Sequence, residues 1–109
     1  MTLKLPDPIA AYVAADNAGD DAALAACFAA DAVVRDEGRT IRGADAILAW
    51  KAESKRKYQY MVEPIAVAEA EGGAVLTGRV SGQFPGSPVE LRYVFGLRGG
   101  RIATLEIHG

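Results

Sequence analysis

The sequence has only one cysteine and one histidine, Cys27 and His108. A lone cysteine excludes a disulfide within the chain, which fits a reducing compartment. Most protein metal sites need several clustered cysteine or histidine ligands, so we expect no metal ion and no other cofactor. A metal site built only from carboxylates stays open, although no motif in the sequence indicates one.

Long apolar runs and an excess of one charge are also missing. The N-terminus has no apolar core of signal-peptide length, and no run approaches the roughly 20 residues that cross a bilayer. The net charge is -2, with acidic and basic residues interleaved rather than gathered into a basic patch. We therefore expect a soluble cytoplasmic protein that binds neither membranes nor nucleic acids.

What is present is an ordinary globular composition. Of the 109 residues, 50% are hydrophobic and 24% are charged, which is far from the balance of a disordered chain. This length suits one hydrophobic core but not a second independent unit. No linker, repeat or low-complexity segment interrupts the chain, so residues 1–109 are predicted to form a single domain.

Capping residues place the first two helices. Asp7 suits the N-cap of the first helix and Pro8 its first turn, while Gly19 suits a left-handed C-cap. Asp20 is placed to cap a second helix, which the alanine-rich sequence extends to Asp31. On the first helix, apolar residues and a tyrosine share one face.

Two short strands and a third helix follow. One strand ends near Asp36, Gly38 turns the chain, and residues 40–42 return beside it. The third helix covers residues 44–56. Its C-terminal cations, residues 51–57, interact well with the helix dipole and are predicted to form a solvated helix end.

The second half of the chain alternates between apolar and polar residues, as strands do. Gly-Gly pairs and one Pro-rich segment are typical of turns between consecutive strands. Four long strands in a meander are predicted at residues 58–70, 74–84, 89–98 and 101–108. The first of these should bend or bulge at Pro64, which cannot donate to a strand ladder. Helices followed by strands indicate an α+β fold with helices on one sheet face.

Three segments of the sequence resemble one known superfamily. They are AYVAADNAGD at residues 11–20, FAADAVVRD at 28–36 and IRGADAI at 41–47. These resemble the nuclear transport factor 2-like superfamily, in particular its SnoaL-like and ketosteroid isomerase branch. The resemblance covers nearly the whole chain. It implies a cystatin-like cone roll, in which three N-terminal helices pack in the concave face of a strongly curved, mainly antiparallel sheet.

The same resemblance implies a pocket and a partner. The cone is expected to enclose a small, largely apolar ligand, and the outer sheet face is expected to form a homodimer. Tyr12 matches the tyrosine that hydrogen-bonds the substrate oxygen in ketosteroid isomerases. Asp36, 24 positions later, matches the aspartate that moves the proton. Apolar walls raise the pKa of a carboxyl group towards a useful base, and a phenol donates without carrying charge.

One position departs from the isomerase pattern. Where that family places a protonated carboxylic acid as a second oxyanion donor, this chain has Tyr93. A phenol can donate but fills more space, which makes steroid isomerase activity doubtful and predicts a smaller cavity. The further residues predicted to line the pocket are Trp50, Met61, Phe84, Phe95 and Leu105, together with Tyr93.

Each candidate also has an ordinary structural interpretation. Tyr12 can pack its ring and turn its hydroxyl towards water, and Asp36 can be a turn residue before Gly38. Three hypotheses therefore stay open. The protein is a proton-transferring isomerase or lyase, a binding module with the same pocket and no chemistry, or a structural dimer without a physiological ligand.

Overall fold

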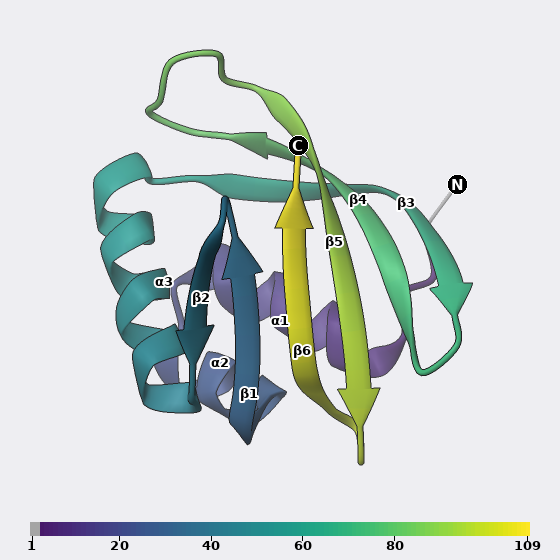
Figure 1. Ribbon diagram of the computed structural model, residues 1–109. Helices are drawn as coiled ribbons and strands as arrows, with labels where there is room; N and C mark the ends of the chain where they lie inside the picture. The colour runs from purple at the N-terminus through teal and green to yellow at the C-terminus, as the bar shows by residue number, and fades with distance from the viewer. Residues whose placement is uncertain (1–2) are drawn as a thin grey trace.

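Within residues 3–109, which the computed structural model describes, three helices pack against one face of a six-stranded mixed sheet (Figure 1). The helices are α1 (Asp7–Ala18), α2 (Asp21–Cys27) and α3 (Ala44–Tyr58). The strands are β1 (Phe28–Asp36), β2 (Arg39–Arg42), β3 (Met61–Ala70), β4 (Gly73–Ser81), β5 (Val89–Arg98) and β6 (Arg101–His108). The predicted α+β fold with three helices on the concave sheet face is confirmed. No helix in this part of the chain is long and apolar enough to cross a membrane.

The caps between α1 and α2 are those that the sequence predicts. Gly19 has a φ of 65° and its N–H donates to the carbonyl groups of Ala15 and Asp16, which ends α1. The Asp20 carboxylate accepts a hydrogen bond from the N–H of Ala23 at 3.1 Å. The predicted start of α1 is wrong by one residue, because Pro6 takes the N-cap position.

The predicted end of the second helix at Asp31 is also wrong. The helix stops at Cys27, and Phe28 already begins β1. Strand β1 pairs with both β2 and β6, and this pairing outweighs the helix propensity of the alanines. Smaller shifts occur later, since α3 continues to Tyr58 and β4 ends at Ser81.

The sheet has the order β2-β1-β6-β5-β4-β3. Strands β3 to β6 form the predicted antiparallel meander, and β1 lies parallel to β6. The register shifts between Pro64 and Ala66, which confirms the predicted irregularity at this proline. In Figure 1, α1 and α2 lie behind the curved sheet and α3 lies beside β2.

The strand register decides which side chains face the helices. Ala32 and Val34 are buried, and Asp36 shares their face because side chains alternate along a strand. Asp36 pairs with Ile107 on β6, which pairs with Tyr93 on β5. The carboxylate of β1 and the phenol of β5 thus lie in one row across the inner face, two strands apart.

Candidate functional site

The ammonium group of Lys51 is the centre of a buried polar cluster between α1 and α3. The lysine is only 5% exposed, and its Nζ donates to Tyr12 Oη at 2.5 Å and to Asp16 Oδ2 at 3.2 Å. Tyr60, in the connection from α3 to β3, donates its hydroxyl to Asp16 Oδ1 at 2.6 Å. We call these four residues, Tyr12, Asp16, Lys51 and Tyr60, the interior polar cluster.

The local sequence explains why α1 supplies two members of this cluster. Tyr12 and Asp16 are four residues apart, so both lie on the face of α1 that is turned towards the core. A buried charge is tolerated only where it is paired and hydrogen-bonded. Here the pairing is complete, since no buried side-chain nitrogen or oxygen within residues 3–109 lacks a partner.

Aromatic rings of the core surround the cluster with apolar surface. The ring of Tyr12 packs edge-on against Phe28 at 6.0 Å and against Phe95 at 5.4 Å, between ring centroids. The ring of Tyr93 lies 6.5 Å from that of Tyr12. Burial raises the pKa of the Tyr12, Tyr60 and Tyr93 phenols, so they stay protonated at neutral pH and can donate.

Burial has the opposite effect on the lysine. Desolvation lowers the pKa of Lys51, although the charge of Asp16 and its hydrogen bond act to raise it. The charge of Asp36 also acts to raise the Lys51 pKa. Both carboxylates, Asp16 and Asp36, therefore favour the charged form of Lys51.

Asp36 stands at the end of β1, partly buried on the inner face. Burial raises its pKa, Glu37 raises it further, and the charges of Lys51 and Arg39 lower it. The charge of Asp36 in turn raises the pKa of both Tyr12 and Tyr93. The structure therefore brings the two matched residues into one electrostatic environment, with Lys51 as the cation that they share.

The other predicted pocket residues separate into two groups. Phe95 and Leu105 are buried in the core, and Trp50 and Phe84 are partly buried against it. Met61 does not join them. Its side chain is 53% exposed on the face of β3 opposite to the buried Val62.

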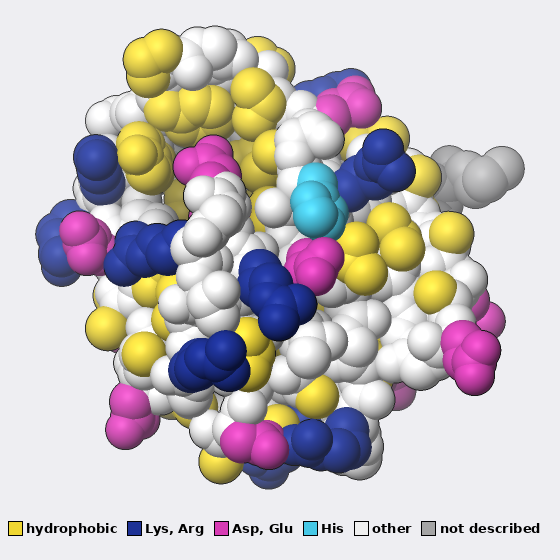
Figure 2. Space-filling view, in the orientation of Figure 1, with side chains coloured by type: hydrophobic (Ala, Val, Ile, Leu, Met, Phe, Trp, Pro, Cys, Tyr) yellow, Lys and Arg dark blue, Asp and Glu magenta, His cyan; other side chains and the backbone are white. Residues whose placement is uncertain are grey.

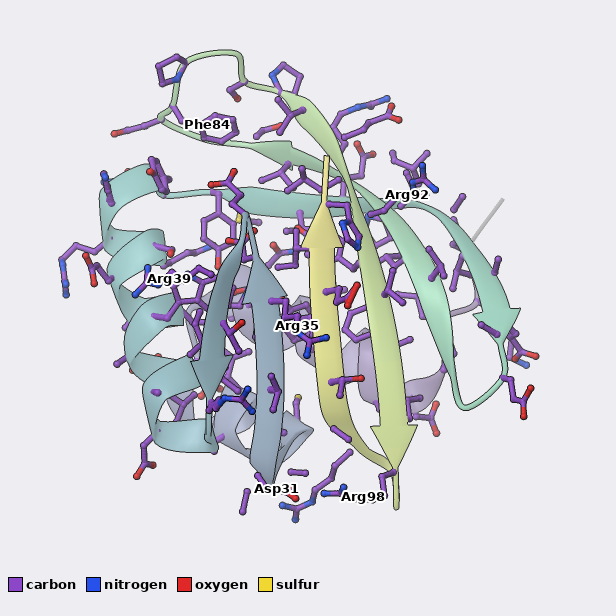
Figure 3. All side chains as sticks on the ribbon, in the orientation of Figure 1. Asp31, Arg35, Arg39, Phe84, Arg92 and Arg98 are labelled. Carbon is purple, nitrogen blue, oxygen red and sulfur yellow. The ribbon has the colours of Figure 1, made fainter. Side chains whose placement is uncertain are left out.

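Phe84 lies at the end of the molecule where β1 ends (Figure 3). It lies in the connection between β4 and β5, above the tips of β1 and β2 (Figure 3). Its ring packs edge-on against Tyr58, the last residue of α3, at 5.9 Å. Asp36, the last residue of β1, belongs to the same end of the molecule. The packed rings of Tyr58 and Phe84 and the end of β1 at Asp36 thus lie at one end of the molecule.

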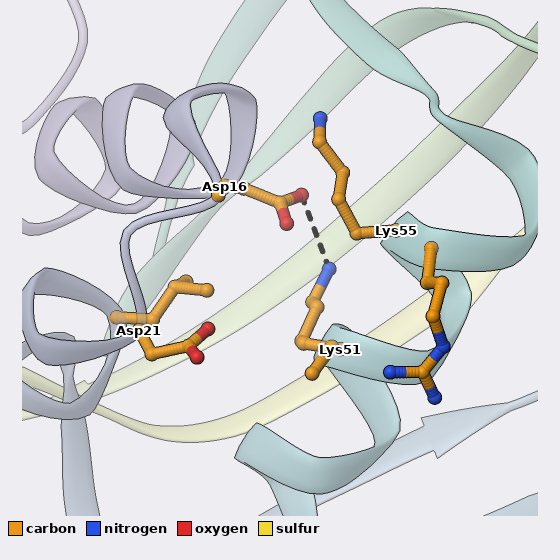
Figure 4. Close-up of a pocket in the computed structure, with 8 residues that line it drawn as sticks. Asp16, Asp21, Lys51 and Lys55 are labelled. Atoms are coloured by element: carbon orange, nitrogen blue, oxygen red, sulfur yellow. Dashed lines mark hydrogen bonds and ion pairs between the residues drawn. The ribbon is translucent and has the colours of Figure 1, made fainter.

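A separate hollow of about 300 Å³ lies on the helical side of the molecule (Figure 4). Its lining includes Asp16, Asp21, Leu24, Lys51, Lys55 and Arg56. Neither Tyr12 nor Asp36 lines it, so it is not the pocket that the sequence predicted. The prediction that the cations of residues 51–57 form a solvated helix end is wrong for Lys51, because α3 turns this side chain inward.

The outer sheet face has a second, smaller hollow. This hollow has a volume of about 200 Å³ and is lined by Val33, Arg35, Val94, Thr104, Leu105 and Glu106. Figure 2 views this face, on which acidic and basic side chains interleave around the single histidine. His108 Nε2 lies 3.2 Å from Glu106 Oε2. Within residues 3–109, no group of three or more His, Cys, Asp or Glu side chains is arranged to hold a metal ion.

The family model for the SnoaL-like domain matches residues 9–105, which is nearly the whole chain. The chain belongs to the SnoaL-like domain family. This confirms the resemblance found in the sequence. The comparison with curated proteins found no match.

Solved structures agree with this SnoaL-like fold. A protein from Sinorhizobium meliloti, named as a candidate polyketide cyclase, is 45% identical over 95% of both chains, with a TM-score of 0.93. A Catenulispora acidiphila protein with a ketosteroid isomerase-like fold, solved with trimethylamine, is 23% identical over 97% of this chain and 87% of that one, with a TM-score of 0.85. An NTF2-like protein from Cytophaga hutchinsonii is 12% identical over 99% and 91%, with a TM-score of 0.81.

Three members of the interior polar cluster, Asp16, Lys51 and Tyr60, were missed by sequence reasoning. The spacing of Tyr12 and Asp16 on the core face of α1 was one available signal, because a carboxylate at a core position needs a cation. The partner was harder to find, since Lys51 stands in a run of cations that resembles an ordinary helix end. Chemically, the arrangement keeps the Tyr12 phenol neutral, so that it can donate a hydrogen bond. It also keeps the Asp36 carboxyl group, whose pKa is raised, in the same electrostatic surroundings.

Proposed function

We propose that this SnoaL-like domain catalyses cofactor-independent proton transfer on a small, largely apolar carbonyl or hydroxyl compound, as an isomerase or cyclase does. Asp36 is the general acid and base, and Tyr12 is the hydrogen-bond donor to the substrate oxygen. The observation that carries the proposal is the buried hydrogen bond from Lys51 Nζ to Tyr12 Oη. This bond occupies the phenol oxygen as an acceptor and leaves its O–H free to donate.

The chemistry follows from these positions. Asp36 removes a proton from the carbon next to a carbonyl group, and negative charge develops on the carbonyl oxygen. The Tyr12 phenol donates to that oxygen, and the Lys51 cation behind the phenol makes it a stronger donor. A single preorganised donor of this kind changes kcat by roughly 10² to 10³.

The environment of Asp36 suits the role of a base. A carboxylate of ordinary pKa is too weak a base to take a proton from carbon efficiently at neutral pH. Burial raises the pKa of Asp36, while the strand end keeps the group partly exposed. The carboxylate can therefore both reach a substrate and exchange its proton afterwards.

The proposed entry route for the ligand is the end of the molecule at which Phe84 and Asp36 lie (Figure 3). Partly buried apolar side chains pack against the core there, among them Tyr58, Phe84, Val89 and Leu91. Tyr12 itself is 1% exposed, so a ligand reaches its hydroxyl only by displacing the rings around it. This favours a small substrate. The name of the Sinorhizobium meliloti relative suggests a polyketide-like carbonyl compound.

The first test is a thermal-shift screen with small apolar ketones and phenols, because a ligand that binds only the folded state must stabilise it. Turnover of each stabilising compound is then measured with Asp36→Asn and Glu37→Gln. We expect Asp36→Asn to bind the compound and lose turnover. The matched control Glu37→Gln removes the neighbouring acid and should retain turnover. Equal turnover by Asp36→Asn and the wild type would exclude Asp36 as the base.

A binding module without chemistry is the second candidate. It is favoured by one observation: the two hollows described above are lined by neither Tyr12 nor Asp36. Under this alternative, Asp36→Asn binds ligands as well as the wild type and no compound is turned over. A structural dimer without a ligand would give no thermal shift with any compound. We further propose a cytoplasmic homodimer formed through the outer sheet face, which size-exclusion chromatography with light scattering would test.

A further inference from the structure

The amine of Lys51 stands between the interior polar cluster and the helical-side hollow. Lys51 lines this hollow, and its Nζ also reaches Tyr12 and Asp16 on α1. We infer that Lys51 is a nucleophile that forms an imine with a small aldehyde or ketone entering this hollow. The activity uses neither Asp36 nor the proposed entry route at Phe84, so it goes beyond the proton transfer proposed above.

The surroundings of the amine supply what imine formation requires. A reactive lysine needs a dry site, a neighbouring group that takes and returns a proton, and space for the carbonyl compound. Lys51 is 5% exposed, Asp16 Oδ2 is 3.2 Å from its Nζ, and the Tyr12 hydroxyl is 2.5 Å away. The adjoining hollow of about 300 Å³ is at the small end of ligand pockets.

The reaction balances with these groups alone. The Lys51 ammonium passes one proton to the Asp16 carboxylate, and the Nζ lone pair attacks the carbonyl carbon. The carbonyl oxygen takes this proton from Asp16, which also lines the hollow and regains a proton from the attacking nitrogen. The resulting carbinolamine takes the proton held by Asp16 and loses its hydroxyl group as water, which leaves a protonated imine. One ammonium and one carbonyl compound thus give one iminium and one water.

Burial and the charges around Lys51 decide how much of its amine is deprotonated. The groups that face Lys51 are Tyr12 and Asp16 on α1, Lys55 on α3, Asp36 on β1, and Tyr60 beside β3. The two carboxylates favour the ammonium, whereas burial and Lys55 favour the neutral amine. Burial is the largest of these effects and lowers the pKa of Lys51, so the fraction of neutral amine exceeds that of an exposed lysine.

The remaining walls indicate the class of carbonyl compound. Leu24 on α2 and Ala52 on α3 provide apolar surface, while Lys55 and Arg56 add positive charge opposite Asp21. Cations outnumber carboxylates in this lining. A short 2-oxo acid therefore fits best, with its carbonyl carbon at Lys51 and its carboxylate towards Arg56.

The test is reductive trapping with pyruvate and cyanoborohydride on the wild-type protein at neutral pH, followed by peptide mapping. The chain offers four lysines to compare, Lys4, Lys51, Lys55 and Lys57. We expect Lys51 to be labelled at least about tenfold faster than Lys57, because Lys51 lines the hollow beside Asp16 and Lys57 does not. The same preference should persist in Lys55→Arg, which keeps the positive charge of the hollow.

Two outcomes would overturn the inference. Labelling of Lys51 at or below the rate of Lys57 would show that the amine stays locked in its ion pair. A preference for Lys51 that survives in urea would show that local sequence, and not the folded hollow, causes the reactivity. Neither outcome bears on Asp36, whose role is measured by turnover, so the two proposals fail separately.

Discussion

Two ion pairs of nearly equal length lie on opposite sides of the sheet. Lys51 and Asp16 are 3.2 Å apart on the helical side, with side chains 5% and 2% exposed. Arg35 and Glu106 are 3.4 Å apart on the outer face, with side chains 62% and 39% exposed. Water screens the outer pair, whereas the inner pair has only its protein partners. We therefore expect burial, and not distance, to decide how much each pair contributes to the stability of the fold.

The largest expected effect comes from breaking the inner pair. Lys51→Met leaves the Asp16 carboxylate buried without its cation, which should lower the free energy of unfolding by about 3–5 kcal/mol. Urea denaturation followed by circular dichroism measures this loss. The double variant Lys51→Met, Asp16→Leu is the control and should recover part of it. A loss below about 1 kcal/mol in the single variant would show that water reaches the carboxylate.

A smaller effect should follow from removing only one hydroxyl of the cluster. Tyr12→Phe keeps the ring packing against Phe28 and Phe95 but deprives Lys51 of one acceptor. Because the lost hydrogen bond involves a charged group, the free energy of unfolding should fall by about 1.5–3 kcal/mol. Tyr60→Phe is the matched variant, because it removes the hydroxyl that donates to Asp16 Oδ1. If both variants unfold with the free energy of the wild type, the hydrogen bonds of these two hydroxyl groups do not stabilise the fold.

The pH dependence of stability distinguishes Asp36 from both pairs. Burial raises its folded-state pKa above the unfolded value, so the folded protein holds more protons between the two. The free energy of unfolding should therefore fall as pH rises from the unfolded pKa through the folded one. Asp36→Asn should remove this decline, which makes the variant more stable than the wild type at neutral pH and equal to it in acid. Parallel stability curves from denaturation between pH 3 and pH 7 would contradict the burial of Asp36.

The smallest effect is expected on the outer face. Arg35→Ala removes a screened ion pair and should change the free energy of unfolding by less than about 1 kcal/mol. The change should shrink further in 1 M salt, since exposed charges are screened there. A loss comparable with that of Lys51→Met would mean that the outer face is buried by a partner in solution.

The sequence predicted most of the fold because its signals are local. Gly19 and Asp20 specify the break between α1 and α2, and the alternating pattern after Tyr58 specifies the meander. The end of α2 was misplaced because the strand at Phe28 is stabilised by β6, which lies far along the chain. No local pattern carries that information.

The site was less predictable for a related reason. The resemblance supplied Tyr12 and Asp36, and the strand register places the latter on the inner face. Lys51 was interpreted as solvated because lysines near a helix end usually are. Only the packing of α3 against α1 shows that one cation of the run is turned towards Asp16.

The central claim is that Asp36 moves a proton at a site where Tyr12 holds the substrate oxygen. Its most direct test is deuterium incorporation from D2O into the carbon next to the carbonyl of a bound ketone, followed by proton NMR. We predict rapid exchange with the wild type, exchange slowed roughly 10² to 10³-fold with Tyr12→Phe, and background exchange with Asp36→Asn. Wild-type exchange by Asp36→Asn, with the ketone still bound, would contradict the account.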